Sequence, residues 1–125
     1  MIDSHCHLNF DSLTNDFNSI IQRAKENNIT AILSINTNPE EFESHYQLIK
    51  KYQSLFISYG LHPGNVNSSN IPTIHSLKLY CEFEQVIGIG ETGLDFYHSK
   101  EYKSEQYKSF ENHIECSYDT NLPLI

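Results

Sequence analysis

The chain has 125 residues, of which 38% are hydrophobic and 19% charged, and its formal net charge at pH 7 is −8. This length fits one ordinary domain with a single core. The acidic balance argues against nucleic-acid binding through a basic protein surface, whereas bound divalent cations can supply the positive charge that a nucleic-acid substrate needs.

No apolar run approaches the roughly 18–20 residues of a membrane span, and the first residues lack the basic and apolar stretches of a signal peptide. We therefore expect a cytoplasmic protein with no membrane partner. The three cysteines, Cys6, Cys81 and Cys116, are widely separated and none belongs to a CxxC pair. The sequence thus favours neither a disulfide framework nor a zinc ribbon.

The first half of the chain predicts two strands, each followed by a helix. Residues 2–8 form the first strand, and residues 12–27 carry apolar side chains at helical spacing. Residues 30–35 are almost entirely apolar, as buried parallel strands are. The second helix is expected to begin at Asn38 and Pro39, because these residue types suit a helix cap and the first helical position.

The second half of the chain repeats this order. Residues 55–60 form the third predicted strand, and a third helix opens at residues 71–72. Residues 86–90 form the fourth strand, and residues 100–119 the fourth helix. Residues 122–125 have the character of a fifth strand at its beginning.

Strands that alternate with helices predict right-handed crossovers and a parallel sheet. An open doubly wound sheet and a (β/α)8 TIM barrel both have this order. No glycine-rich dinucleotide motif follows the first strand, and polar residues gather where strands end, as they do at the rim of a TIM barrel. We therefore predict an α/β fold of the TIM-barrel type. A complete barrel takes about 250 residues, so we expect only the first four βα units and the start of strand five.

The first rim segment is the alternation of Asp3, His5 and His7. Alternate side chains of a strand point to the same face, so His5 and His7 are placed to hold one ion between them. Neutral imidazole suits zinc and other first-row divalent metals. Asp3 is expected to orient a histidine or to lie deeper in the barrel. The alternative is a surface strand with one polar face.

Two more polar residues follow predicted strands. His62 stands between the third strand and a Pro-Gly turn, where we expect a contact with phosphate or substrate; the alternative is a turn histidine bonded to backbone. Glu91 follows the glycine-containing fourth strand, and a carboxylate at that point can bridge two cations. Asp95 lies in the next loop, where it either acts nearby or is solvated.

Together these segments resemble the TatD family of metal-dependent deoxyribonucleases. The resemblance rests on IDSHCHL (2–8), GLHP (60–63) and GETGLDFY (90–97), followed by a helix with Gln106 and Phe110 and by LPLI (122–125). It implies a TIM-barrel hydrolase that cleaves phosphodiester bonds in DNA with two divalent metals, which are Mg, Mn or Zn. By the same resemblance, His5 and His7 bind the first metal, Glu91 bridges both metals and is the catalytic carboxylate, and His62 lies near the scissile phosphate.

The resemblance also implies ligands that cannot be assigned here: a histidine after the fifth strand, another after the sixth and an aspartate near the eighth. His98, His113, His45 and His75 lie in the fourth loop or within helices and are expected to be structural or solvated. We therefore expect residues 1–125 to be the N-terminal half of such a barrel domain, truncated, with half a binuclear site and no activity on its own.

Two alternatives to a DNA nuclease remain at this point. One is another metal-dependent hydrolase with an H-x-H first strand, either a phosphoesterase or an amidohydrolase. The other is a non-catalytic half-barrel that associates with itself or with a partner chain, because half a barrel leaves strand edges and apolar surface uncovered.

Overall fold

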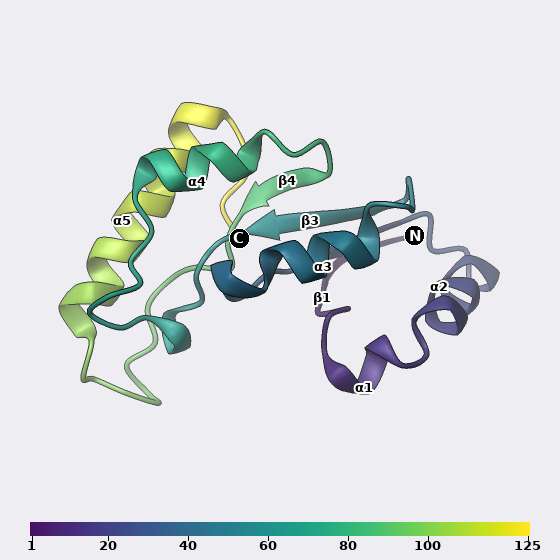
Figure 1. The fold of residues 1–125 in the computed structure, drawn as a ribbon, viewed down its shortest axis with the longest axis horizontal. Coiled ribbons are helices and arrows are strands. Elements are labelled where there is room, and N and C mark those ends of the chain that lie inside the picture. Colours follow the sequence, from purple (N-terminus) through teal and green to yellow (C-terminus); the bar gives the residue numbers. More distant parts are fainter.

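A computed structural model describes residues 1–125 and contains a four-stranded sheet with its strands in the order β1-β2-β3-β4 (Figure 1). All neighbouring strands are parallel. Their bounds are β1 (Ile2–Cys6), β2 (Ala31–Ser34), β3 (Leu55–Tyr59) and β4 (Val86–Ile89). The predicted parallel sheet is confirmed, and sequential parallel strands joined by helices are the first units of a TIM-barrel fold.

Helices connect each strand to the next. They are α1 (Asp11–Thr14), α2 (Phe17–Glu26), α3 (Phe42–Ile49), α4 (Ile74–Cys81) and α5 (Lys103–Thr120), with short 3-10 turns η1 (Pro39–Glu41) and η2 (Pro63–Asn65). The long helix α5 lies against α4 (Figure 1). None of these helices combines the length and the apolar character needed to cross a bilayer.

The expected single helix over residues 12–27 is wrong, because α1 and α2 are separate. Asp16 lies between them with φ −120° and ψ 23°, outside the helical region. The side chains of Thr14 and Asn15 donate to the backbone oxygen of Asp11, at 3.3 Å and 3.4 Å. Short polar side chains that bond to backbone in this way compete with helical hydrogen bonds, which explains the break.

Other helix boundaries differ by a few residues. Helix α4 begins at Ile74 rather than at 71–72, because the Thr73 side chain caps it by accepting a hydrogen bond from the backbone N–H of Ser76. Helix α5 begins at Lys103 rather than Lys100. The predicted cap is confirmed, since the Asn38 side chain accepts a hydrogen bond from the N–H of Glu40, although the first turn is 3-10.

One hydrophobic core lies between the helices and one face of the sheet. Phe42 of α3 is at its centre, fully buried, with edge-on contacts to Tyr59 of β3 and Tyr80 of α4 at ring-centroid distances of 5.0 Å. Aromatic pairs in this arrangement add to the free energy gained by burial. On β4, Ile87 points away from this core and is 37% exposed. The helices are thus packed on one face, and the opposite face is open.

Residues 122–125 lie beside β4 as its next parallel neighbour. The N–H of Ile89 donates to the oxygen of Pro123 at 2.8 Å, and the N–H of Ile125 donates to the oxygen of Ile89 at 2.9 Å. A parallel bridge joins Ile89 and Leu124. The strand character predicted for this segment is therefore confirmed.

Candidate metal centre

The carboxyl ends of β1, β3 and β4 bring four predicted side chains to one rim. His5 lies in β1 and His7 directly after it, while His62 and Glu91 follow β3 and β4. Ligand atoms of His5, His7 and Glu91 all lie within 4.8 Å of one another. Two histidines and a carboxylate form a donor set that suits zinc or another first-row divalent cation.

The separations between these atoms fit a shared ion. Nε2 of His5 and Nε2 of His7 lie 3.7 Å and 3.9 Å from Oε2 of Glu91. Both distances are too long for hydrogen bonds. Two ligand atoms at roughly 2.1 Å from one tetrahedral ion lie about 3.4 Å apart, so only small side-chain adjustments separate this arrangement from a coordinating one.

The ring of His7 is oriented by the backbone just after strand β2. Its Nδ1 lies 3.1 Å from the carbonyl oxygen of Ile35. A carbonyl only accepts, so Nδ1 carries the proton and donates, which leaves Nε2, 3.9 Å from Oε2 of Glu91, with a lone pair for a metal ion. Metal-binding histidines are commonly fixed in this way by a second hydrogen bond.

In His62 the roles of the two ring nitrogens are reversed, because Nδ1 accepts a hydrogen bond and does not donate one. The backbone N–H of Gly64 donates to its Nδ1 at 3.0 Å. The neutral ring therefore carries its proton on Nε2, which lies 3.8 Å from Oε1 of Glu91. An Nε2–H group is a hydrogen-bond donor and not a metal ligand. His62 is thus suited to donate to an anionic oxygen beside the metal donors.

Glu91 is held through its own backbone. Its N–H donates to the oxygen of Asn36, and the N–H of Gly90 donates to the oxygen of Tyr59, both at 2.9 Å. Gly90 has a φ of +145°, and a Cβ on Gly60 would lie 2.5 Å from the Cα of Gly90. Glycine at both positions lets the ends of β3 and β4 approach, which places the carboxylate opposite the histidines.

The two acidic residues near the rim bond to backbone and lie outside the donor cluster. Oδ1 of Asp3 accepts from the N–H of His5 at 3.2 Å, and the pairing register shifts between Asp3 and Cys6, which interrupts simple alternation. Asp95 accepts from the N–H groups of its own loop and contacts His98 Nδ1 at 2.6 Å. The hydrogen bonds with His98 lower the pKa of Asp95.

Of the three helical histidines, His113 and His45 are structural and His75 is solvated, which agrees with the expectation. In α5, the Nδ1–H of His113 donates to the oxygen of Ser109 at 2.7 Å, and its Nε2 accepts from the N–H of Leu61 at 3.1 Å. Burial lowers the pKa of His113. This neutral ring fixes the residue that precedes His62. His75 is exposed on α4.

His45 of α3 is fully buried and lies 2.7 Å from the hydroxyl of Ser34. Burial, followed by the charge of His7, lowers the pKa of His45 to about 4. The same hydroxyl accepts from the backbone N–H of Leu8 at 3.1 Å. Ser34 therefore ties helix α3 to the loop that carries His7.

The sequence predictions missed two residues beside the site. The ring of Phe10 is stacked on His7, with centroids 4.9 Å apart and planes 6° from parallel. Asn36 is fully buried, and neither polar atom of its side chain has a partner. An aromatic residue three positions after His7 and an amide directly after the apolar run 30–35 were the only signals, and neither indicates a role without the fold.

Comparisons with known proteins agree with this geometry. Residues 2–125 match the family model described as "TatD related DNase". A protein of Buchnera aphidicola, named an "Uncharacterized metal-dependent hydrolase", is 34% identical over the whole chain, which covers 48% of that protein. The hydrolase YcfH of Escherichia coli is 30% identical over the whole chain, with 48% of its own length covered.

A solved structure gives the same result. The crystal structure of YJJV, a TatD homologue of Escherichia coli, aligns with a TM-score of 0.84 and 26% identity over 99% of the chain and 49% of its own. The chain thus spans about half the length of the relatives it matches. The family match over residues 2–125, together with the rim donors of a parallel α/β fold, shows that the chain belongs to the TatD family of metal-dependent hydrolases.

Proposed function

We propose that the rim site serves metal-dependent hydrolysis of phosphodiester bonds in DNA. The observation that carries the proposal is the convergence of His5, His7 and Glu91, with Nε2 of His7 left unprotonated by the bond from Nδ1 to Ile35. The family description as a DNase supports the substrate class. The formal charge of −8 makes cations necessary for holding a phosphate here.

In this proposal His5, His7 and Glu91 are metal ligands and His62 binds substrate. A divalent cation at the site supplies Lewis acidity, activating water at neutral pH and offsetting charge on the phosphoryl oxygens. The protein residues position these partners. His62 donates its Nε2–H to a phosphate oxygen, because its Nδ1 is already occupied by the N–H of Gly64. No side chain is required as a nucleophile.

We further propose that the complete centre holds two cations with Glu91 between them. Oε2 of Glu91 is the carboxylate oxygen near His5 and His7, whereas Oε1 is the one near His62. A second cation needs more donors than these three residues offer. Those donors would come from outside residues 1–125, so these residues carry half of a binuclear site.

The experiment measures Mn²⁺ and Zn²⁺ binding to residues 1–125 by calorimetry, beside cleavage of a labelled oligonucleotide. We expect metal binding that His5→Ala removes and His75→Ala, an exposed histidine on α4, leaves unchanged. We expect little cleavage by the chain alone, and His5-dependent cleavage after mixing with the C-terminal half of YcfH. If His5→Ala leaves metal binding unchanged, the assignment of His5 as a ligand is wrong. If the chain alone cleaves the oligonucleotide robustly, the proposal that it carries only half of the site is wrong.

The second candidate is a non-catalytic half-barrel that associates with another chain. It is favoured by the open sheet face, where Ile87 is 37% exposed, and by Ile2, which is 67% exposed in the edge strand β1. Exposed strand edges and apolar surface promote association. Light scattering coupled to size-exclusion chromatography tests this role: a monomer at all concentrations counts against it.

A further inference from the structure

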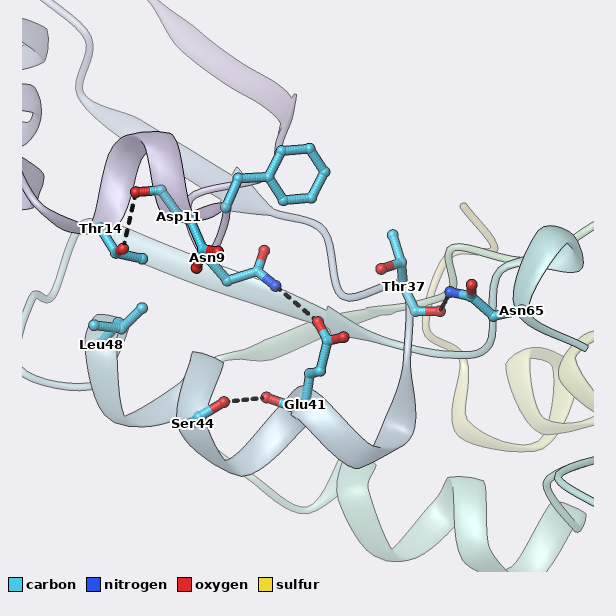
Figure 2. Close-up of a pocket in the computed structure, with 9 residues that line it drawn as sticks. Asn9, Asp11, Thr14, Thr37, Glu41, Ser44, Leu48 and Asn65 are labelled. Carbon is cyan, nitrogen blue, oxygen red and sulfur yellow. Dashed lines mark hydrogen bonds between the residues drawn. The ribbon is translucent and has the colours of Figure 1, made fainter.

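A polar cleft of about 740 Å³ is lined in part by Phe10, which contacts the candidate metal ligand His7. Figure 2 shows the residues that line this cleft. It is bounded by the loop before α1, by α1 itself, by η1 and α3, and by Asn65 of η2. Asn9 and Glu41 face each other across it, and Nδ2 of Asn9 donates to Oε2 of Glu41 at 3.2 Å (Figure 2).

The cleft is joined to the metal centre on two sides. At one side it is lined by Phe10, whose ring is stacked on that of His7. At the other it is lined by Thr37, whose backbone oxygen accepts from the N–H of His62 at 2.9 Å and from Nδ2 of Asn65 at 3.0 Å. A molecule bound at the metal centre therefore has this cleft as its immediate neighbour.

The chemistry of the lining excludes a second phosphate site. The lining includes the carboxylates of Asp11 and Glu41 and contains no lysine or arginine. Oε1 of Glu41 has no protein hydrogen-bond partner, and Oδ1 of Asn9 is buried without one. Glu41 is exposed, so its Oε1 is open to a ligand that carries N–H donors. Phe10 is 50% exposed, which leaves ring surface available for stacking.

We propose that this cleft binds the nucleobase of the nucleotide next to the phosphate at the metal centre. The inference rests on the proposed function and adds a base-binding subsite to it. Phe10 stacks on the base, as aromatic side chains do in proteins that bind single strands. Glu41 accepts from the exocyclic amino group, a pairing that carboxylates make with the N4 amino group of cytosine.

The same contacts set a preference among bases. Cytosine presents an amino group with two N–H donors to a carboxylate. Thymine presents one N–H between two carbonyl oxygens, and these oxygens repel a carboxylate placed in the same plane. The subsite therefore favours cytosine over thymine, and Glu41 is its specificity-determining residue.

The test is an NMR titration of ¹⁵N-labelled residues 1–125 with deoxycytidine and with thymidine. Neither nucleoside carries a phosphate, so binding reports on the cleft and not on the metal centre. We expect deoxycytidine to shift the amide signals of Phe10, Thr37 and Glu41. Phe10→Ala weakens this binding about tenfold, and Phe10→Leu, which keeps apolar bulk without an aromatic face, weakens it similarly. Tyr118→Ala, which removes an aromatic side chain that is 84% exposed on α5, has no effect.

Glu41→Gln tests the preference, because an amide both donates and accepts. We expect this variant to bind the two nucleosides equally. The proposal is overturned if deoxycytidine leaves the cleft signals unchanged, or if the unsubstituted chain binds thymidine equally well. Deoxycytidine binding without metal-dependent cleavage in the mixed-half assay would refute the nuclease function and keep the subsite. Cleavage without nucleoside binding would refute the subsite alone.

Discussion

The side chains of His7 and Glu91 meet at 3.9 Å although they follow strands at opposite ends of the four-strand order. In a flat sheet, three strand spacings would separate β1 from β4 by about 14 Å. The sheet is therefore curled so that its carboxyl ends turn inward, as the strands of a barrel do. This curvature places the donors from β1 and β4 in one site.

Replacing Glu91 with glutamine is expected to weaken Zn²⁺ or Mn²⁺ binding at least tenfold. The amide keeps the shape of the side chain but removes the charge that faces both histidines. Changes even to groups that only support metal ligands cost about 10–100-fold in affinity, so the loss of a ligand charge should cost no less. Calorimetric titration measures the effect, with Glu43→Gln on exposed α3 surface as the control. Equal affinity in the two variants would remove Glu91 from the site.

Replacing His62 with asparagine separates substrate binding from metal binding. The Asn oxygen can still accept from the N–H of Gly64, so the turn should be kept. The donor to phosphate is lost, and a hydrogen bond to a charged group is worth about 1.5–3 kcal/mol. We expect the variant to bind an oligonucleotide at least tenfold more weakly in the presence of metal. Its affinity for the metal itself should be unchanged. A parallel loss of metal affinity would show that His62 is a ligand.

Much of this arrangement could be predicted from the sequence, because it follows from local patterns. Apolar runs separated by helical periods give the parallel order, and polar residues at strand ends give His5, His7, His62 and Glu91. The break at Asp16 was missed because it depends on side-chain bonds to the Asp11 carbonyl. The stack of Phe10 on His7 also could not be foreseen, since it depends on how the loop turns after β1.

Replacing Ser34 with alanine is expected to destabilise the fold by about 2–6 kcal/mol. The change leaves the buried N–H of Leu8 and Nε2 of His45 without partners, and each unsatisfied buried group costs about 1–3 kcal/mol. Urea unfolding monitored by circular dichroism gives the free energy of unfolding. Ser69→Ala, in an exposed turn, provides the control and should change it by less than about 0.5 kcal/mol. A similar small change for Ser34→Ala would mean that water replaces the hydroxyl.

Protonation of His45 should make the protein less stable below neutral pH. Burial lowers the pKa of His45 from 6.5 to about 4, so the unfolded state binds more protons than the folded state between these values. The contribution of neutral His45 to the free energy of unfolding is fully present above about pH 6.5. It falls as the pH drops toward 4, by about 3 kcal/mol in total at 1.36 kcal/mol for each pKa unit.

The measurement is urea unfolding at pH 7.0, 5.5 and 4.5 for the unsubstituted chain and for His45→Gln. Glutamine does not titrate, so the variant should have lower stability at pH 7.0 but a shallower decline below it. His113, whose pKa is also lowered by burial, contributes equally to both proteins and leaves the difference between their slopes to His45. Identical slopes would show that acid destabilisation arises elsewhere, and that the Ser34–His45 contact tolerates a charged ring.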